Sequence, residues 1–208
     1  MEPELIFGGT FDPVHVGHLI VARAVAESQG YGRVVLMPSA TPPHKDGPDA
    51  TAGQRLEMLR LATEGDKLFH VSDLELNMEG KSYTVRTLEE LREHRPGTRP
   101  CLLIGMDMLE DLPNWYEAQQ VVNMTDFAIA ARAPWQGRLE QILPTLRNAF
   151  GTEKGNELAE SIIETPIIEI SSTDIRRRLA EGKTVRYLVP DAVEKYIRDQ
   201  RLYRKEAR

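Results

Sequence analysis

The chain has 208 residues, of which 41% are hydrophobic and 28% charged, with a formal net charge of −6. These values are typical of one globular domain with a buried core, and the acidic balance argues against a dedicated nucleic-acid binder, which is normally basic. The single cysteine, Cys101, excludes an internal disulfide and a cysteine-rich zinc site. No basic stretch precedes an apolar run at the N-terminus, so we expect neither a signal peptide nor a membrane span, and a cytoplasmic protein.

Short apolar runs alternate with helical patterns along the chain. We expect strands at 4–8, 33–37, 68–72, 100–105, 126–131 and 166–170, and helices between them at 17–29, 53–64, 84–94, 116–123 and 138–149. Pro144 should break or kink the last of these helices. The polar segment 151–165 fits either helix or loop. Such alternation predicts an α/β fold with a doubly wound parallel sheet and helices on both faces.

After residue 170 the chain turns helical again, over 173–181 and 190–201. We therefore expect one domain over residues 1–208, with a core of residues 1–170 and a small C-terminal helical lobe of residues 171–208. The segment 38–53 is too rich in proline and glycine for helix or sheet. It follows the second strand at its carboxyl end, the edge where open α/β sheets bind ligands.

The most informative stretch is residues 8–18, GGTFDPVHVGH, which joins the first apolar run to a helix. Two glycines without Cβ atoms let a bulky anion approach the backbone. The helix start directs unpaired N–H groups and the positive end of its dipole toward the same turn. His15 and His18 should both lie on the first helical turn. This pattern predicts a polyphosphate site with chemistry at phosphorus; the alternative is that the two histidines only cap or pack.

Residues 170–176, ISSTDIR, carry a second signal at a strand-to-helix junction. Ser171 and Asp174 have the spacing of a capping box, which contributes about 1 kcal/mol to helix stability. A capping box does not account for the third hydroxyl or for Arg176, whose charge opposes the helix dipole unless an anion lies there. We therefore expect a second phosphate site at this helix start.

These two motifs resemble the G-x-[FT]-x-P-x-H-x-G-H and I-S-S-T-x-I-R signatures of the nucleotidyltransferase superfamily, which has a Rossmann-like fold. Three further segments resemble the bacterial nicotinate-mononucleotide adenylyltransferases: PSATPPHK at 38–45, GKSYTV at 80–85 and GMDMLEDLPNW at 105–115. The resemblance runs in one order from Leu5 to Tyr203. The chain departs from the family at Arg86, where an acidic residue is usual.

The resemblance implies transfer of AMP from ATP to nicotinate mononucleotide, with Mg²⁺ required and no side-chain metal ligand assigned. It places catalysis on His15 and His18. Contacts to ATP and its phosphates fall on Gly8, Gly9, Thr10, Phe11, Lys45, Gly105, Asp107, Ser172, Thr173 and Arg176. Contacts to nicotinate mononucleotide fall on His44, Ser82, Tyr83, Thr84 and Trp115. Nucleic acid and membrane are not expected as partners, and the oligomeric state stays open, a homo-oligomer included.

Each intermediate segment also has a plainer interpretation. Trp115 fits an ordinary core residue, His44 and Lys45 a solvated loop, and Asp107 and Thr84 helix N-caps. Two other functions compete with the proposed one. A sister adenylyltransferase that acts on phosphopantetheine normally has threonine in place of His15 and lacks the 80–85 and 105–115 segments. A non-catalytic nucleotide-binding module would not need His15 or Arg176.

Overall fold

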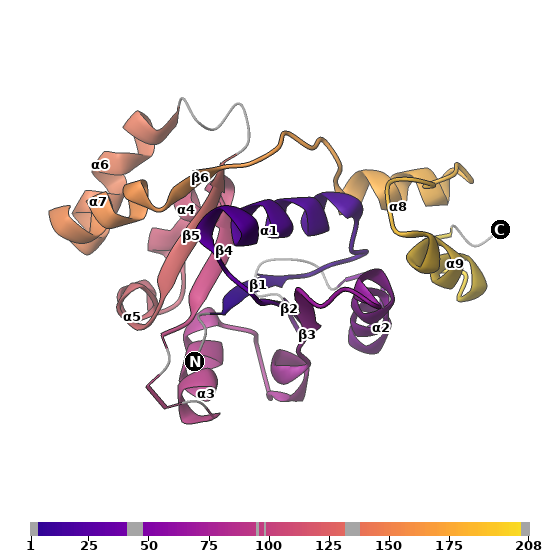
Figure 1. Ribbon diagram of the computed structural model, residues 1–208, viewed down its shortest axis with the longest axis horizontal. Helices are drawn as coiled ribbons and strands as arrows, with labels where there is room; N and C mark the ends of the chain where they lie inside the picture. Colours follow the sequence, from indigo (N-terminus) through magenta and orange to yellow (C-terminus); the bar gives the residue numbers. More distant parts are fainter. Residues whose placement is uncertain (1–3, 41–47, 95, 98, 132–137, 205–208) are drawn as a thin grey trace.

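The computed structural model describes residues 4–40, 48–94, 96–97, 99–131 and 138–204. Its centre is a sheet of parallel strands in the order β3-β2-β1-β4-β5-β6 (Figure 1). The strands are β1 (Leu5–Gly9), β2 (Val34–Pro38), β3 (Phe69–Val71), β4 (Cys101–Gly105), β5 (Asp126–Ala131) and β6 (Ile162–Glu164). The strand order reverses between β1 and β4, as in a doubly wound Rossmann-like sheet. The predicted fold class is therefore confirmed.

Helices follow the strands as expected from the alternating pattern. They are α1 (Val16–Gln29), α2 (Ala52–Thr63), α3 (Thr84–His94), α4 (Met106–Asp111), α5 (Ala118–Met124), α6 (Leu139–Phe150), α7 (Thr152–Glu160), α8 (Ser172–Ala180) and α9 (Asp191–Asp199). Two short 3₁₀ turns complete them, η1 (Leu74–Asn77) and η2 (Leu112–Asn114). The sequence analysis did not predict α4, η1 or η2, because segments of six residues or fewer show no helical period.

Successive strand residues point to opposite faces of the sheet, so the sheet builds two apolar clusters. On β1, Leu5 packs in the cluster shared with α1, α2, α8 and α9, whereas Ile6 packs in the cluster shared with α3 to α7. On β2, Leu36 and Met37 divide in the same way. Both faces of the sheet are therefore covered, which explains why its strands read as nearly continuous apolar runs.

The structure corrects two predictions, the strand at 166–170 and the break at Pro144. The sixth strand is β6, and the predicted strand at 166–170 has no regular structure. Pro166 has no N–H to donate to the ladder, so pairing ends at Thr165, whose N–H and hydroxyl both donate to the carbonyl of Ala131. Pro144 does not break its helix, because α6 continues through it to Phe150. The segment 151–165 resolves into α7 and β6.

The C-terminal segment lies on the face of the sheet that α1 and α2 cover, and α9 lies beside α2 (Figure 1). Ile175 of α8 and Val193 and Ile197 of α9 belong to the same cluster as Leu5. This packing brings the end of the described chain close to the turn that follows β1. No helix among the described residues has the length and apolar character needed to cross a membrane.

Candidate active site

The turn after β1 is shaped by Phe11, whose backbone is left-handed at φ 50°. Its ring lies over Gly9, where a Cβ would lie 3.2 Å from two ring carbons, so any larger residue there would require the Phe11 ring to move. A Cβ on Gly8 would meet nothing within 4 Å, as expected for a backbone position open to a ligand. The Phe11 side chain is buried in the core, so the ATP contact predicted for this residue would be made by its backbone.

His15 and His18 form a reciprocal cap at the start of α1. His15 is the N-cap residue, so only His18 lies in the first turn. Nδ1 of His15 accepts the His18 N–H at 3.3 Å, and Nδ1 of His18 accepts the His15 N–H at 3.2 Å. The two rings are stacked, with centroids 3.6 Å apart. Because both Nδ1 atoms act as acceptors, the proton of each neutral ring lies on Nε2. Capping therefore sets the tautomer that makes Nε2–H a donor, and the two interpretations of this motif are compatible.

Neighbouring residues hold the histidine pair in place. A Cβ on Gly17 would lie 3.0 Å from Nδ1 of His15, which explains the glycine between the two histidines. The rings of Phe7 and Phe11 meet the His18 ring edge-on, with centroids 5.9 and 5.1 Å away. The imidazoles are thus positioned by packing as well as by hydrogen bonds, as a preorganised site requires.

The second motif lies directly against this turn. Ser171 is the N-cap of α8 and accepts the Asp174 N–H at 3.1 Å, so the N-cap half of the predicted capping box is present. The Asp174 carboxylate pairs with Arg177. The Ser172 hydroxyl donates to the carbonyl of Pro13 at 2.9 Å, which joins residues 159 positions apart. Thr173 is exposed. The fold therefore brings the two predicted phosphate motifs together.

Arg176 is oriented by acceptors of the protein itself. Its Nη1 donates to the carbonyl of Asp12 at 2.6 Å, and its Nε pairs with the Asp49 carboxylate at 2.7 Å. These protein acceptors account for a cation one turn into α8, where the sequence analysis expected a bound anion. The guanidinium is held beside the turn that carries His15.

Asp12 is a site residue that sequence reasoning did not assign, although it lies inside the first motif. It is 4% exposed, and its carboxylate accepts the N–H groups of Asp49 at 2.8 Å and Ala50 at 3.1 Å. It also accepts the Tyr203 hydroxyl at 2.6 Å. Burial, reinforced by this hydrogen bond, raises the pKa of Tyr203 above its usual value. Nothing local in the sequence indicates that residue 203 returns to residue 12.

Arg55 is the second residue that the sequence did not reveal. It is fully buried, and its guanidinium donates to the carbonyls of Thr10 at 2.8 Å, Ala40 at 3.3 Å and Ala50 at 3.3 Å. Burial lowers the pKa of Arg55, and the nearby Asp12 carboxylate partly opposes this shift. One side chain thus ties together the segments that follow β1 and β2.

The residues predicted to bind the pyridine lie on two neighbouring segments. Ser82, Tyr83 and Thr84 form the entry to α3, and Thr84 is the first helical residue rather than an N-cap. Trp115 is half-buried at the edge of the second cluster, so it is not an ordinary core residue. Tyr116, which the sequence analysis passed over, is 53% exposed and places its ring 4.6 Å from that of Tyr83.

Gly105 and Asp107 lie at the carboxyl end of β4, next to β1. A Cβ on Gly105 would lie 2.5 Å from Oδ1 of Asp107, so the glycine leaves room for this carboxylate. Gly105 is the N-cap of α4 and Asp107 is exposed in its first turn, so Asp107 is not the capping residue. His44 and Lys45 lie outside the described residues.

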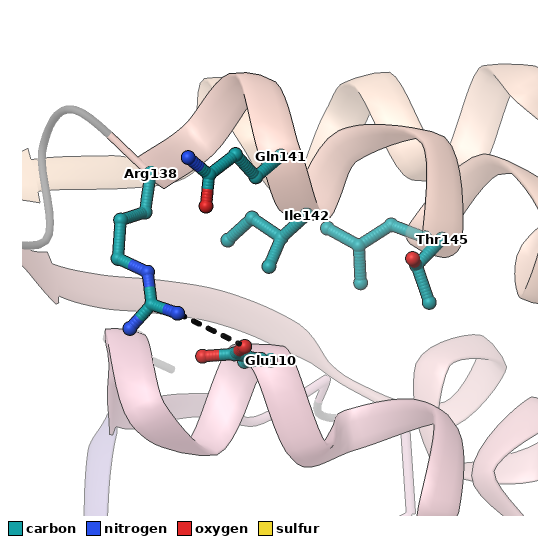
Figure 2. A pocket seen from close by; sticks show the side chains of 6 residues that line it. Glu110, Arg138, Gln141, Ile142 and Thr145 are labelled. Carbon is teal, nitrogen blue, oxygen red and sulfur yellow. Dashed lines mark ion pairs between the residues drawn. The ribbon is translucent and has the colours of Figure 1, made fainter.

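A cavity of about 200 Å³ between α4 and α6 is lined by none of these residues. Figure 2 shows Arg138 and Glu110 facing each other across it, with Nη2 and Oε1 3.8 Å apart. The cavity is lined by Glu110, Arg138, Gln141, Ile142, Thr145 and Leu146. None of these residues was predicted as a site residue. Across the described ranges, no group of three or more His, Cys, Asp or Glu side chains is arranged to hold a metal ion.

Comparison with known proteins agrees with this geometry. Residues 6–178 match the family model described as cytidylyltransferase-like. The chain is 39% identical over 199 residues to a "Probable nicotinate-nucleotide adenylyltransferase" of Synechococcus sp. (strain JA-2-3B'a(2-13)), which covers 95% of each chain. It is 38% identical over 209 residues to a protein of the same name from Yersinia pestis (strain Pestoides F), covering 96% of this chain and 94% of the relative.

Solved structures share the fold. Nicotinic acid mononucleotide adenylyltransferase of Plasmodium falciparum, complexed with NaAD, superposes with a TM-score of 0.77 at 20% identity over 98% of both chains. The same enzyme complexed with APC gives a TM-score of 0.74 at 19% identity over 98% of both chains. Together with the sequence relatives, which align over nearly their whole length, these findings show that the chain belongs to the cytidylyltransferase-like family and, within it, to the nicotinate-nucleotide adenylyltransferases.

Proposed function

We propose that this protein transfers the adenylyl group of ATP to nicotinate mononucleotide, giving deamido-NAD and pyrophosphate. One observation carries the proposal: the fold joins the two predicted phosphate motifs. The Ser172 hydroxyl donates a hydrogen bond to the carbonyl of Pro13, two residues before His15 of the stacked histidine pair. Together these motifs direct two helix starts, two imidazoles and a guanidinium toward the turn after β1. Such a set of donors suits a polyphosphate that gains charge during reaction.

The reaction is an in-line displacement at the α-phosphorus of ATP. A phosphate oxygen of the mononucleotide forms the new P–O bond, while the bond from the α-phosphorus to the bridging oxygen breaks and pyrophosphate leaves with the electron pair. A phosphate monoester is a competent nucleophile at neutral pH, so no covalent enzyme intermediate is needed. Catalysis then depends on positioning and on stabilisation of charge. We assign the Nε2–H donors of His15 and His18 to the α-phosphate oxygens.

We assign the remaining phosphate oxygens to backbone groups and side chains around the same turn. Gly8, Gly9, Thr10 and Phe11 would contribute at the first motif, Ser172, Thr173 and Arg176 at the second, and Lys45 from the segment after β2. Gly105 and Asp107 would receive the ribose. His44, Ser82, Tyr83, Thr84 and Trp115 would bind the mononucleotide, with the indole stacked on the pyridine ring and first-turn N–H groups of α3 facing its carboxylate.

We further propose that Mg²⁺ accompanies ATP and is held mainly by phosphate oxygens and water. The residues present fit this arrangement, because the carboxylate of Asp12 already accepts three protein donors, which weakens it as a metal ligand. When bound, the ion would neutralise charge on the departing pyrophosphate. The cytoplasmic location expected from the sequence stays a prediction, and the oligomeric state stays open.

The test is pyrophosphate release with ATP and Mg²⁺, comparing nicotinate mononucleotide, its amide and phosphopantetheine as acceptors. Strong preference for the acid supports both the reaction and the assigned pyridine site. Equal use of the amide would support adenylyl transfer but contradict the binding of the nicotinate carboxylate at the start of α3. Activity only with phosphopantetheine favours the sister enzyme, and no activity with any acceptor favours a nucleotide-binding module.

A further inference from the structure

Glu75 is a partly buried carboxylate that none of the site assignments uses. It lies in η1, after β3, and is packed against the entry to α3. The Thr87 hydroxyl donates to its Oε1 at 2.8 Å, and the Ser82 side chain is hydrogen-bonded to the same carboxylate. Burial raises the pKa of Glu75, whereas the two hydroxyl donors lower it. A partly buried carboxylate whose two hydroxyl donors, Ser82 and Thr87, both lie at the start of α3 indicates a specific role for Glu75 there.

Ser82 carries this connection on to the segment after β2. The backbone N–H of Ala40 donates to Oγ of Ser82 at 2.9 Å. Because Oγ accepts this N–H and has one proton to give, its own proton is directed to Glu75. The hydrogen bonds therefore run in one direction, from Ala40 to Ser82 and from Ser82 to Glu75. These two hydrogen bonds set the separation between the end of β2 and the start of α3.

The other side of the same turn is held by Arg86, at the position where the chain departs from its family. Nη1 of Arg86 donates to the carbonyl of Glu79 at 2.9 Å. Gly80 follows with φ 89°, and a Cβ there would lie 3.2 Å from Nη1 of Arg86. The turn from residue 79 to residue 83 is thus anchored at both ends, by Arg86 and by Glu75 acting through Ser82.

We propose that Glu75 is a positioning residue for the acceptor: through Ser82 it holds the first turn of α3 in the geometry that binds the nicotinate carboxylate. This inference rests on the proposed function. The first N–H groups of a helix bind a carboxylate well, provided that the turn is held in place. In α3 the N–H groups of Arg86 and Thr87 donate to the carbonyl of Tyr83, so we assign those of Thr84 and Val85 to the carboxylate. In this proposal Glu75 acts through Ser82 rather than by contact with the acceptor, since a carboxylate in contact with an anionic ligand would repel it.

The proposal is tested with Glu75→Ala and Glu75→Gln, and with Glu79→Gln as the matched control. Glu79 lies on the same segment, is exposed, and undergoes the same chemical change. For Glu75→Ala we expect KM for nicotinate mononucleotide to rise about tenfold, the scale of losing one hydrogen bond to a charged group. KM for ATP should stay within about twofold, as for a surface change. Preference for the acid over the amide should fall, and Glu79→Gln should match the wild type.

Three outcomes overturn the proposal. They are an unchanged KM for nicotinate mononucleotide, a lower KM in Glu75→Gln, which would indicate direct repulsion of the ligand, and parallel rises in both KM values with a fall in Tm. If Glu75→Ala does not fold, a double-mutant cycle replaces it, in which Glu75→Gln and Ser82→Ala are measured singly and together. Non-additive effects on KM support action through Ser82, and additive effects refute it. Wild-type turnover separates the two levels, because an inactive wild type refutes the proposed function, whereas an active one with unaffected variants refutes only this inference.

Discussion

Tyr203 offers the sharpest test of how the C-terminal segment supports the site. Its hydroxyl donates to Oδ1 of Asp12 at 2.6 Å, and Asp12 in turn directs its carbonyl to Arg176. Tyr203→Phe removes one oxygen and leaves the ring in the cluster that covers α2. The carboxylate of Asp12 keeps its two backbone donors, from Asp49 and Ala50, so the variant removes a single charge-assisted hydrogen bond.

A hydrogen bond to a charged group contributes about 1.5–3 kcal/mol. We therefore expect Tyr203→Phe to lose about 2 kcal/mol in the free energy of unfolding and about 4–8 °C in Tm for a chain of this size. Because the pKa of Tyr203 is raised in the folded state, the unfolded chain ionises first as pH rises. The contribution is fully present below about pH 10 and is lost above it, so the difference between wild type and variant should shrink at alkaline pH.

The assay is thermal and urea unfolding at pH 7.5, repeated between pH 9 and pH 11. Tyr187→Phe is the matched control, because Tyr187 is 75% exposed and the same oxygen is removed from its side chain. The control should melt like the wild type. A Tm of Tyr203→Phe within about 1 °C of the wild type would refute the argument, since one charged hydrogen bond predicts a larger shift. So would a stability difference that grows above pH 10.

Three further predictions concern the catalytic turn and the acceptor. His18→Ala should lower kcat by about 10²–10³-fold, the scale of losing one electrostatic donor, and unchanged turnover in a steady-state assay would contradict the mechanism. Gly17→Ala should also lower kcat, because its Cβ would lie 3.0 Å from Nδ1 of His15, whereas Gly53→Ala, with nothing within 4 Å, serves as control; equal kcat in both variants would remove the packing argument. Trp115→Ala should raise KM for nicotinate mononucleotide with little change in kcat, since stacking persists from ground state to transition state; loss of kcat alone would speak against stacking.

Much of the architecture follows from local patterns in the sequence. Alternation of apolar runs with helical periods predicted the parallel sheet, and five of the six strands lie where expected. The sixth could not be placed, because Ile162-Ile163 and Ile167-Ile168 present the same apolar pair on either side of Pro166. Pairing with β5 selected the first pair, and proline ended the strand.

The candidate site divides in the same way. The local geometry of the two predicted phosphate motifs could be inferred from the sequence, because glycines, histidines and a capping serine act on the backbone within a few positions of themselves. Phosphate binding by these residues stays a prediction. What only the tertiary structure decided is which distant groups support the candidate site. Arg55 donates to the Thr10 carbonyl and Tyr203 to the Asp12 carboxylate, whereas Glu75 is hydrogen-bonded to Ser82 at the entry to α3. Each of these contacts joins segments that meet only because the whole sheet and its helices pack together. Local periodicity in the sequence cannot predict such contacts, since it indicates which face of an element is buried and not which residue packs against that face.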